Sequence, residues 1–387
     1  MAVDLDKYLG REQSFIKHSF LTQYLQAAAY KVLQGRSPVF NFVDAFAGPW
    51  NVSDQNYSDA SFDQALRTLD TVRGDLDRRG IGGLKIRFCF CEKRGEAVNE
   101  LRAYAKQKGR FEIHVFHGSF EDHLDGISSA CHDGFTFTFI DPTGWNMRSE
   151  PVFRFLRDQR GEFLLNFMAE HVNRHAEFPN VAASFGRFLA DPDWEDDFNR
   201  LQSEWSNEQR VLYLLKKKVK ATGAATYLPD FPIMKPRENR VKMRLILGTH
   251  SARGLEVFRD VQEKVERIEI ETRNQLRTPS SQQVGLFSDS EIAALEQNIT
   301  GVGCPMYQRE AEQQIVACLT GRQFVPFSEI TSSVLEAVPI RLTQLKELVG
   351  QLRARDLIAY DLPLRKRVPQ PETRIRLGDP KIGERNF

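Results

Sequence analysis

Short, almost unbroken apolar segments recur through the first part of the chain and alternate with amphipathic, more polar stretches. Five of them occupy residues 39–44, 86–91, 113–117, 135–140 and 162–167. They are rich in β-branched and aromatic residues, which is typical of parallel strands that are covered on both faces. Because helix-like stretches such as 93–108 separate them, the pattern predicts a doubly wound α/β domain.

Further elements are expected on either side of these strands. Apolar residues at helical spacing predict helices over 12–34 and 251–273, and the long connection 51–84 contains a helix-like piece. Residues 180–222 read as a helical insertion with two tryptophans. The segments 225–234 and 241–248 are separated by a short polar turn, so they predict an antiparallel strand pair that closes the sheet.

The pattern changes after residue 273. Residues 274–304 are polar and rich in turn formers, which favours a linker. Three helical stretches and two strand-like runs follow, with a basic loop between the strands, and that order is typical of a winged helix-turn-helix. We therefore expect an α/β domain over 1–273 with an insertion at about 180–222, a linker over 274–304, and a winged-helix domain over 305–387.

The composition indicates the class of protein and its cellular compartment, but says little about its activity. The 387 residues are 41% hydrophobic and 27% charged with a net charge of +1, which is ordinary for a globular protein. The five cysteines include no C-x-x-C pair, and we interpret them as free thiols in a reducing cytoplasm. The polar N-terminus and the lack of a long apolar window predict neither a signal peptide nor a membrane span. We expect no metal site.

Four short motifs fall at the ends of successive predicted strands. They are VDAFAGPW (43–50), CEK (91–93), HGSFED (117–122) and FIDPTGW (139–145). Ligands of open α/β sheets bind outside the carboxyl ends of the strands, so these motifs would line one edge of one sheet. A glycine lets the backbone approach a ligand there, and a carboxylate such as Glu92 can accept hydrogen bonds from both hydroxyls of a ribose.

Plainer interpretations of each motif stay open. DAFAG is compatible with a tight strand–helix turn, and Glu92 with a solvated charge at a strand end. Trp145 would stack on a flat substrate or cap the sheet as a buried tryptophan. The order of the four motifs favours the functional interpretation, because four accidents at the same edge are improbable.

The series resembles the class I S-adenosylmethionine-dependent methyltransferases, and most closely the three-Cys-motif partner (TcmP) family, over roughly residues 7–273. Further points of likeness are Lys17-His18 on the early helix, LLNF at 164–167 and LILGTHSARGLEVF at 245–258. The resemblance implies a Rossmann-like methyltransferase sheet and S-adenosylmethionine as cofactor. It also implies a radical-SAM-type protein as partner, since TcmP proteins are described as encoded beside one that carries the three cysteines.

The resemblance also assigns roles to individual residues. Asp44 and Gly48 would contact the methionine part of the cofactor, and Glu92 would hold its ribose. The cofactor-binding set is completed by Phe46 and by Ser119 and Phe120, the last two beside the adenine, whereas Asp141 would face the acceptor as the catalytic residue. The chain departs from the family pattern at Trp50, where a second glycine is expected, and at Thr143, where amino-methyltransferases acting on bases have a second proline.

The C-terminal module carries the basic charge of the chain. Residues 340–387 contain 11 Lys and Arg against 6 Asp and Glu, a net charge of +5. We expect nucleic acid, either DNA or RNA, to contact a recognition helix and a wing. The expected substrate-binding residues are Trp145 in the first domain and Arg341, Lys346, Arg365, Lys366 and Arg367 in the module. Winged helices also serve as protein-docking modules.

Two functions from different classes follow. The first is a methyltransferase-like protein that acts on or with nucleic acid, with in-line transfer from the sulfonium to an acceptor near Asp141. The second is a catalytically inactive adaptor that binds nucleic acid and a protein partner, in which Trp50 closes the cofactor cleft. A third interpretation, a nuclease-like enzyme, is less favoured by the sequence.

Overall fold

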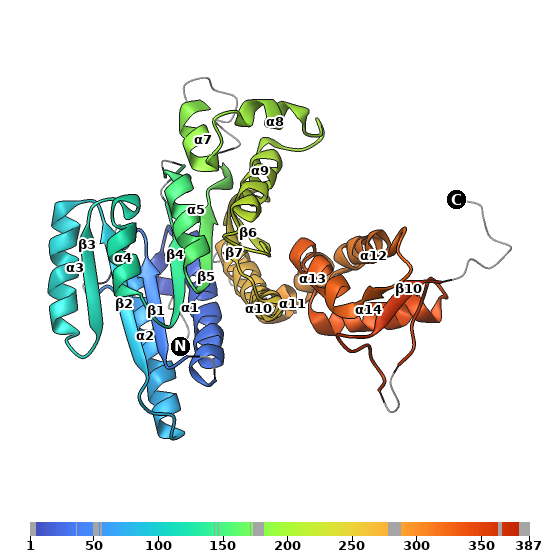
Figure 1. The fold of residues 1–387 in the computed structure, drawn as a ribbon, viewed down its shortest axis with the longest axis horizontal. Coiled ribbons are helices and arrows are strands. Elements are labelled where there is room, and N and C mark those ends of the chain that lie inside the picture. Colours follow the sequence, from blue (N-terminus) through green and yellow to red (C-terminus); the bar gives the residue numbers. More distant parts are fainter. Residues whose placement is uncertain are drawn as a thin grey trace. The chain divides into compact units, whose positions relative to one another are not determined.

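The chain folds into two compact units that divide between residues 251 and 252. The structure is a computed structural model, shown in Figure 1, and it describes residues 5–35, 37–48, 54, 56–142, 144–145, 147–170, 172, 182–277, 288–362 and 366–378. We expected the first domain to extend to residue 273. The helix over 252–277 belongs instead to the second unit.

A seven-stranded sheet forms the centre of the first unit, in the order β3-β2-β1-β4-β5-β7-β6 (Figure 1). The strands β1 to β5 are parallel, and β7 runs antiparallel to both of its neighbours. The predicted strands and the antiparallel pair at one edge are thereby confirmed. Their bounds are Val39–Asp44, Lys85–Glu92, Glu112–His117, Phe135–Ile140, Gly161–Phe167, Asp230–Met234 and Val241–Gly248.

Helices cover both faces of this sheet, which is therefore Rossmann-like. One face carries α1 (Glu12–Leu33), α2 (Ser61–Arg78) and α3 (Gly95–Gln107). On that side Phe62 of α2 packs against Phe90 of β2 and Tyr104 of α3, with ring centroids 5.7 and 5.0 Å away. The other face buries Val43, Cys89 and Cys91 with residues of α4 (Leu124–Ala130) and α5 (Ser149–Asp158). Burial on both faces explains why the strands show so few polar residues.

Three helices of the described residues lie in the region expected to be an insertion. They are α7 (Ala182–Leu189), α8 (Trp194–Arg200) and α9 (Asn207–Thr222). The helix α9 begins at a capping box formed by Ser206 and Gln209 and ends at Gly223, which has a φ of 77°. The described part of the first unit also contains two 3-10 helices, Leu5–Tyr8 and Phe120–Asp122.

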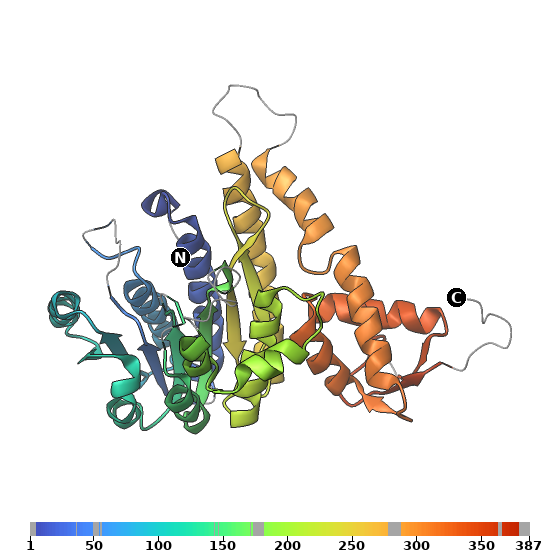
Figure 2. The same ribbon diagram turned by 90° about the horizontal axis from the view of Figure 1, so that it is seen from above.

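The second unit combines five helices of the described part of the chain with a small sheet. The helices are α10 (Ala252–Arg277), α11 (Asp289–Thr300), α12 (Pro305–Leu319), α13 (Phe327–Ala337) and α14 (Leu342–Ala354). The strands β8 (Val325–Pro326), β10 (Arg374–Leu377) and β9 (Ile358–Ala359) pair in that order and antiparallel. Figure 2 shows α10 and α11 side by side, so part of the expected linker is helix.

A buried arginine explains why α10 belongs to the second unit. Arg259, 1% exposed, donates to the carbonyl oxygens of Leu335 and Glu336 at 2.8 and 2.9 Å. These carbonyls lie in the last turn of α13, where helix carbonyls lack partners within the helix. The contact therefore fixes α10 to the C-terminal helices.

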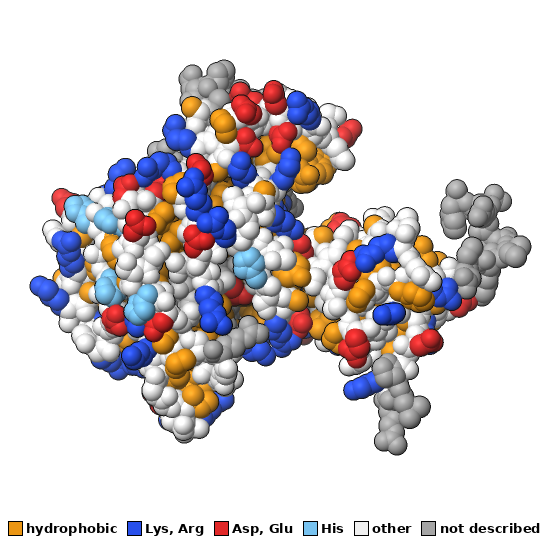
Figure 3. Space-filling model, viewed as in Figure 1, with side chains coloured by type: hydrophobic (Ala, Val, Ile, Leu, Met, Phe, Trp, Pro, Cys, Tyr) orange, Lys and Arg blue, Asp and Glu red, His pale blue; other side chains and the backbone are white. Residues whose placement is uncertain are grey.

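The mixed charge of the surface and the free state of the cysteines agree with what the composition predicts. Figure 3 shows Lys and Arg side chains interspersed with Asp and Glu over the face of the first unit in that view. All five cysteines are free thiols. Within the ranges that the structure describes, no helix is long and apolar enough to cross a membrane.

Candidate active site at the carboxyl ends of the strands

A cavity of about 470 Å³ opens at the carboxyl ends of the parallel strands in the first unit. We call it the strand-end cavity. Small-molecule sites generally have volumes of about 300–1,000 Å³. Its walls come from the turns after β1, β2, β3 and β4, from the end of β5, from α1 and from β7. The predicted residues among its lining are Phe46, Gly48, Glu92, Ser119, Phe120 and Asp141.

Asp44 organises the turn after β1 from behind the cavity wall. Its carboxylate accepts hydrogen bonds from the backbone N–H of Phe46 at 3.1 Å and from the hydroxyl of Ser61 at 2.6 Å. The side chain is buried, and burial raises the pKa of Asp44 to about 7. Asp44 is not among the lining residues, whereas Phe46 and Gly48 are. Trp50, the departure from the family pattern, lies outside the described residues.

Glu92 ends β2 with a buried carboxylate at the cavity. The residue is 4% exposed, and its Oε1 accepts a hydrogen bond from the backbone N–H of Arg94 at 2.6 Å. The carbonyl of Glu92 accepts from the N–H of Gly118 at 3.0 Å, which joins the ends of β2 and β3. A carboxylate at the wall of a cavity can accept hydrogen bonds from hydroxyl donors.

The turn after β3 requires glycine. Gly118 has a φ of 150°, and a side-chain carbon there would lie 2.6 Å from Nε2 of His123. The next residue, Ser119, donates through its hydroxyl to Asp122 at 2.5 Å. Phe120 is buried and meets Phe155 of α5 edge to face, with ring centroids 5.6 Å apart. The turn thus presents one polar and one aromatic residue to the cavity.

Asp141 is held by two residues that sequence reasoning did not assign to the site. Its Oδ2 pairs with the ammonium of Lys17 from α1, and its Oδ1 accepts from Nδ2 of Asn166 at 2.6 Å. Asn166 belongs to β5, and both Lys17 and Asn166 line the cavity. The available signals were an asparagine inside the apolar run LLNF and a lysine among the apolar positions of the first helix.

A buried polar chain continues along α1 beside Lys17. Nδ1 of His18 forms a 2.8 Å hydrogen bond with the hydroxyl of Tyr8, which also accepts from Nε2 of Gln64 at 2.6 Å. Burial, with a smaller contribution from the charge of Lys17, lowers the pKa of His18 to about 3. His18 is therefore neutral at pH 7, and it lines the cavity.

Trp145 packs against α7. Its Nε1 donates to the hydroxyl of Ser184 at 3.0 Å, and its ring stacks on Phe185 with centroids 4.6 Å apart. It is absent from the described lining of the cavity. This placement agrees with the packing interpretation of the tryptophan, in which it covers apolar surface.

The predicted nucleic-acid residues lie in the second unit, and one of them is engaged within it. Arg341 forms an ion pair with Glu263 of α10 at 2.9 Å. Lys346 is half-buried on α14, whereas Lys366 and Arg367 are exposed between β9 and β10. Arg365 lies outside the described residues.

Within the described ranges, no group of three or more His, Cys, Asp or Glu side chains is placed to hold a metal ion. His171 and His175, which are spaced four residues apart, fall outside those ranges.

Comparisons with known proteins give structural likeness only. No protein-family model matches the chain, and no curated protein matches it. A protein described as a caffeoyl-CoA O-methyltransferase from Staphylococcus aureus is similar in structure, with 11% identity and a TM-score of 0.26 over 58% of this chain and 81% of that one. The CMeT domain of the citrinin polyketide synthase is similar with 12% identity and a TM-score of 0.27, over 55% of this chain and 47% of that one.

Proposed function

We propose that this protein is an S-adenosylmethionine-dependent methyltransferase that acts on or with nucleic acid. The observation that carries the proposal is the convergence of four separate strand ends on one cavity. Gly48, Glu92, Phe120 and Asp141 follow β1, β2, β3 and β4, and all four line the strand-end cavity. Such a convergence at the carboxyl edge is the usual position of a ligand in an open α/β sheet.

The residues around the cavity fit the parts of that cofactor. The buried carboxylate of Glu92 suits the two ribose hydroxyls, and Phe120 offers an aromatic ring on the β3 side for the adenine. The glycine at position 48 lets the backbone approach the methionine part. When bound, the cofactor supplies an electrophilic methyl group on its sulfonium.

On the acceptor side the protein contributes position and charge. Lys17 and Asn166 each bind one oxygen of Asp141, so the carboxylate has a fixed orientation at the end of β4. An oriented carboxylate can accept a hydrogen bond from the acceptor group and hold its reacting atom in line with the methyl group. Alignment of this kind contributes much of the rate in bimolecular transfers.

The proposal also includes two binding partners, nucleic acid and a radical-SAM-type protein. The order α12, β8, α13, α14, β9, β10 in the second unit supports a winged helix as part of this proposal, and Lys366 and Arg367 are exposed between β9 and β10. These features support nucleic acid as the partner of this unit. Membership of the TcmP family, and with it a radical-SAM-type partner, rests on the motif series alone.

Calorimetric titration of the full chain with S-adenosylmethionine tests the proposal. We expect saturable binding with a Kd in the micromolar range. Absence of heat at near-millimolar cofactor would overturn the methyltransferase assignment. If nucleic acid still bound under those conditions, the inactive adaptor would be the better description.

A further inference from the structure

The strand order divides the strand-end cavity into two halves. Glu92, Ser119 and Phe120 lie on the β2 and β3 side, where the proposed function places ribose and adenine. The other half lies over β4, β5 and β7 and is lined by Lys17, His18, Asp141, Asn166, Met168 and Met243. We call this second set the acceptor half.

The charges of the acceptor half are already paired within the protein. Lys17 is matched by Asp141, and the neighbouring Arg11 pairs with Asp59. His18 is neutral, and Met168 and Met243 add apolar surface. Among the described residues of this half, a charged acceptor such as a carboxylate or an ammonium would find no uncompensated opposite charge. Burial of an unpaired charge is strongly unfavourable. The acceptor half therefore suits a neutral group with apolar faces.

His18 adds a hydrogen-bonding edge to this neutral surface. Its Nδ1 is engaged by Tyr8, whereas Nε2 has no hydrogen-bond partner among the described residues. Because His18 lines the cavity, Nε2 is the ring nitrogen that remains to meet a ligand. A neutral ring nitrogen pairs with a polar edge of a planar group without adding charge.

Outside the cavity, the same side of the sheet is basic. Phe167 of β5 pairs with Arg244 of β7, and Met234 pairs with Val241, so the β6–β7 turn lies beyond the carboxyl edge of the sheet. The cations of this turn and of the start of β7 are Lys235, Arg237, Arg240 and Lys242, which we call the hairpin cations. Their described acidic partners are Glu170 and Glu238, which leaves a net charge of +2.

One hairpin cation stands apart from these pairs. Arg237 is exposed and has no ion-pair partner among the described residues. An exposed guanidinium suits a phosphate, which it can bind in a bidentate manner.

A neutral interior beside a cationic rim fits a neutral base on an anionic chain. We propose that the methyl acceptor is an unpaired nucleobase of a nucleic-acid strand, with the base in the acceptor half against His18 and the phosphates on the hairpin cations. This inference rests on the proposed function and names the substrate class of the same site. Enzymes that modify a base act on single strands or take the base out of the stack, so a single strand is expected to bind better than a duplex.

The binding part of the proposal is tested with fluorescein-labelled 20-mers of random sequence, as single-stranded RNA, single-stranded DNA and duplex, followed by anisotropy. The double variant Arg237→Glu/Arg240→Glu is expected to bind single strands at least ~10-fold more weakly. The slope of the logarithm of its binding constant against the logarithm of the salt concentration is expected to be smaller by about two in magnitude. Arg154→Glu/Arg157→Glu makes the same charge change at exposed positions of α5 and is expected to bind like the wild type. Loss of binding only in Lys366→Glu/Arg367→Glu would overturn the role of the hairpin.

The acceptor part is tested by incubating the full chain with the same strands and S-adenosylmethionine tritiated in its methyl group. After digestion to nucleosides we expect label on a base. We expect His18→Ala to raise KM for the strand more than tenfold with unchanged cofactor binding. We expect His114→Ala, at a half-buried histidine of β3, to change neither. Absence of labelled strand despite cofactor binding would overturn the proposal. Failure of the cofactor to bind would overturn the proposed function, while strand binding to the hairpin would still be measurable.

Discussion

Lys17 on the first long helix forms an ion pair with Asp141 at the end of β4, 124 residues further along the chain. The side chains are only 9% and 22% exposed, so water screens the pair weakly. With Asn166 on the other carboxylate oxygen, the pair joins α1, β4 and β5 at one point. This point lies in the wall of the strand-end cavity, so a change there should alter catalysis more than cofactor binding.

Substitution of Lys17 tests that expectation. Lys17→Met keeps the apolar stem and removes the charge, which leaves Asp141 free to turn away from the acceptor. We expect methyl transfer to fall about 100-fold, the range that misplacement of a catalytic group produces, while the Kd for S-adenosylmethionine changes less than about threefold. Lys31→Met, at an exposed position of the same helix, is the matched control. Equal loss of transfer in both variants would contradict the role of Lys17.

Glu92 is expected to determine the affinity for the cofactor. Glu92→Gln keeps the shape but replaces a charged acceptor with a neutral amide, and a hydrogen bond to a charged group contributes about 1.5–3 kcal/mol. We therefore expect calorimetry to give a Kd that is roughly 10- to 100-fold higher. Glu96→Gln changes an exposed carboxylate in the first turn of α3 and should leave the Kd as it is. An unchanged Kd for Glu92→Gln would place the ribose elsewhere.

The sheet could be predicted from the sequence because its strands are buried on both faces. A parallel strand such as Val39–Asp44 must be apolar nearly throughout, so its limits are visible in the residues themselves. The strand-end residues followed from the strand limits, since parallel strands bring their carboxyl ends to one edge. Lys17 and Asn166 could not be placed in the same way, because their roles depend on a contact between segments far apart in the chain.

The boundary between the two units could not be predicted from the sequence for a different reason. The amphipathic pattern of α10 shows that one face is buried but not which helices cover it, and the contact of Arg259 with the end of α13 decides the question. The helix α11 had a local signal that could have been used. Ser288 and Glu291 form the S-x-x-E capping box at its start, inside the segment that we interpreted as a linker.

Asp44 should make stability depend on pH. Its pKa rises from 3.8 in the unfolded reference to about 7 in the folded state, chiefly because of burial. Between these values the folded state binds more protons, so the protein loses stability as pH rises from about 4 to 7. Asp44→Asn removes this dependence. We therefore expect the free energy of unfolding of the variant, relative to that of the wild type, to increase by up to about 4 kcal/mol as the pH rises from 4 to 8. Urea unfolding at both pH values measures the difference.

The control for this pH dependence is Asp125→Asn, at an exposed aspartate of α4. It should follow the wild-type pH profile. If Asp44→Asn also followed the wild-type profile, Asp44 would be ionised in the folded protein at pH 7 in spite of its burial.

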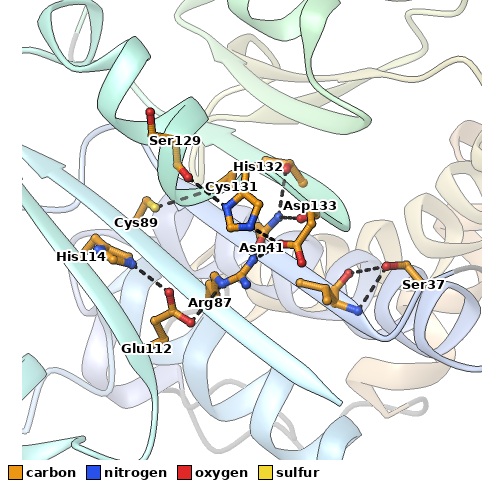
Figure 4. Close-up of polar contacts among 12 residues, drawn as sticks. Ser37, Asn41, Arg87, Cys89, Glu112, His114, Ser129, Cys131, His132 and Asp133 are labelled. Carbon is orange, nitrogen blue, oxygen red and sulfur yellow. Dashed lines mark hydrogen bonds and ion pairs between the residues drawn. The ribbon is translucent and has the colours of Figure 1, made fainter. Parts of the chain in front are cut away.

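Arg87 should stabilise the edge of the sheet opposite the cavity. Figure 4 shows its guanidinium between Glu112 and Asp133, and Nε lies 3.0 Å from the glutamate oxygen. The arginine side chain is 7% exposed, whereas the two carboxylates are about half exposed and can be solvated when it is lost. We therefore expect Arg87→Met to lower the free energy of unfolding by only about 2 kcal/mol, less than for a fully buried pair. Arg154→Met removes an exposed pair with Glu150 and should change stability by less than about 0.5 kcal/mol. Equal urea midpoints for the two variants would show that the Arg87 contacts contribute no more than a surface pair.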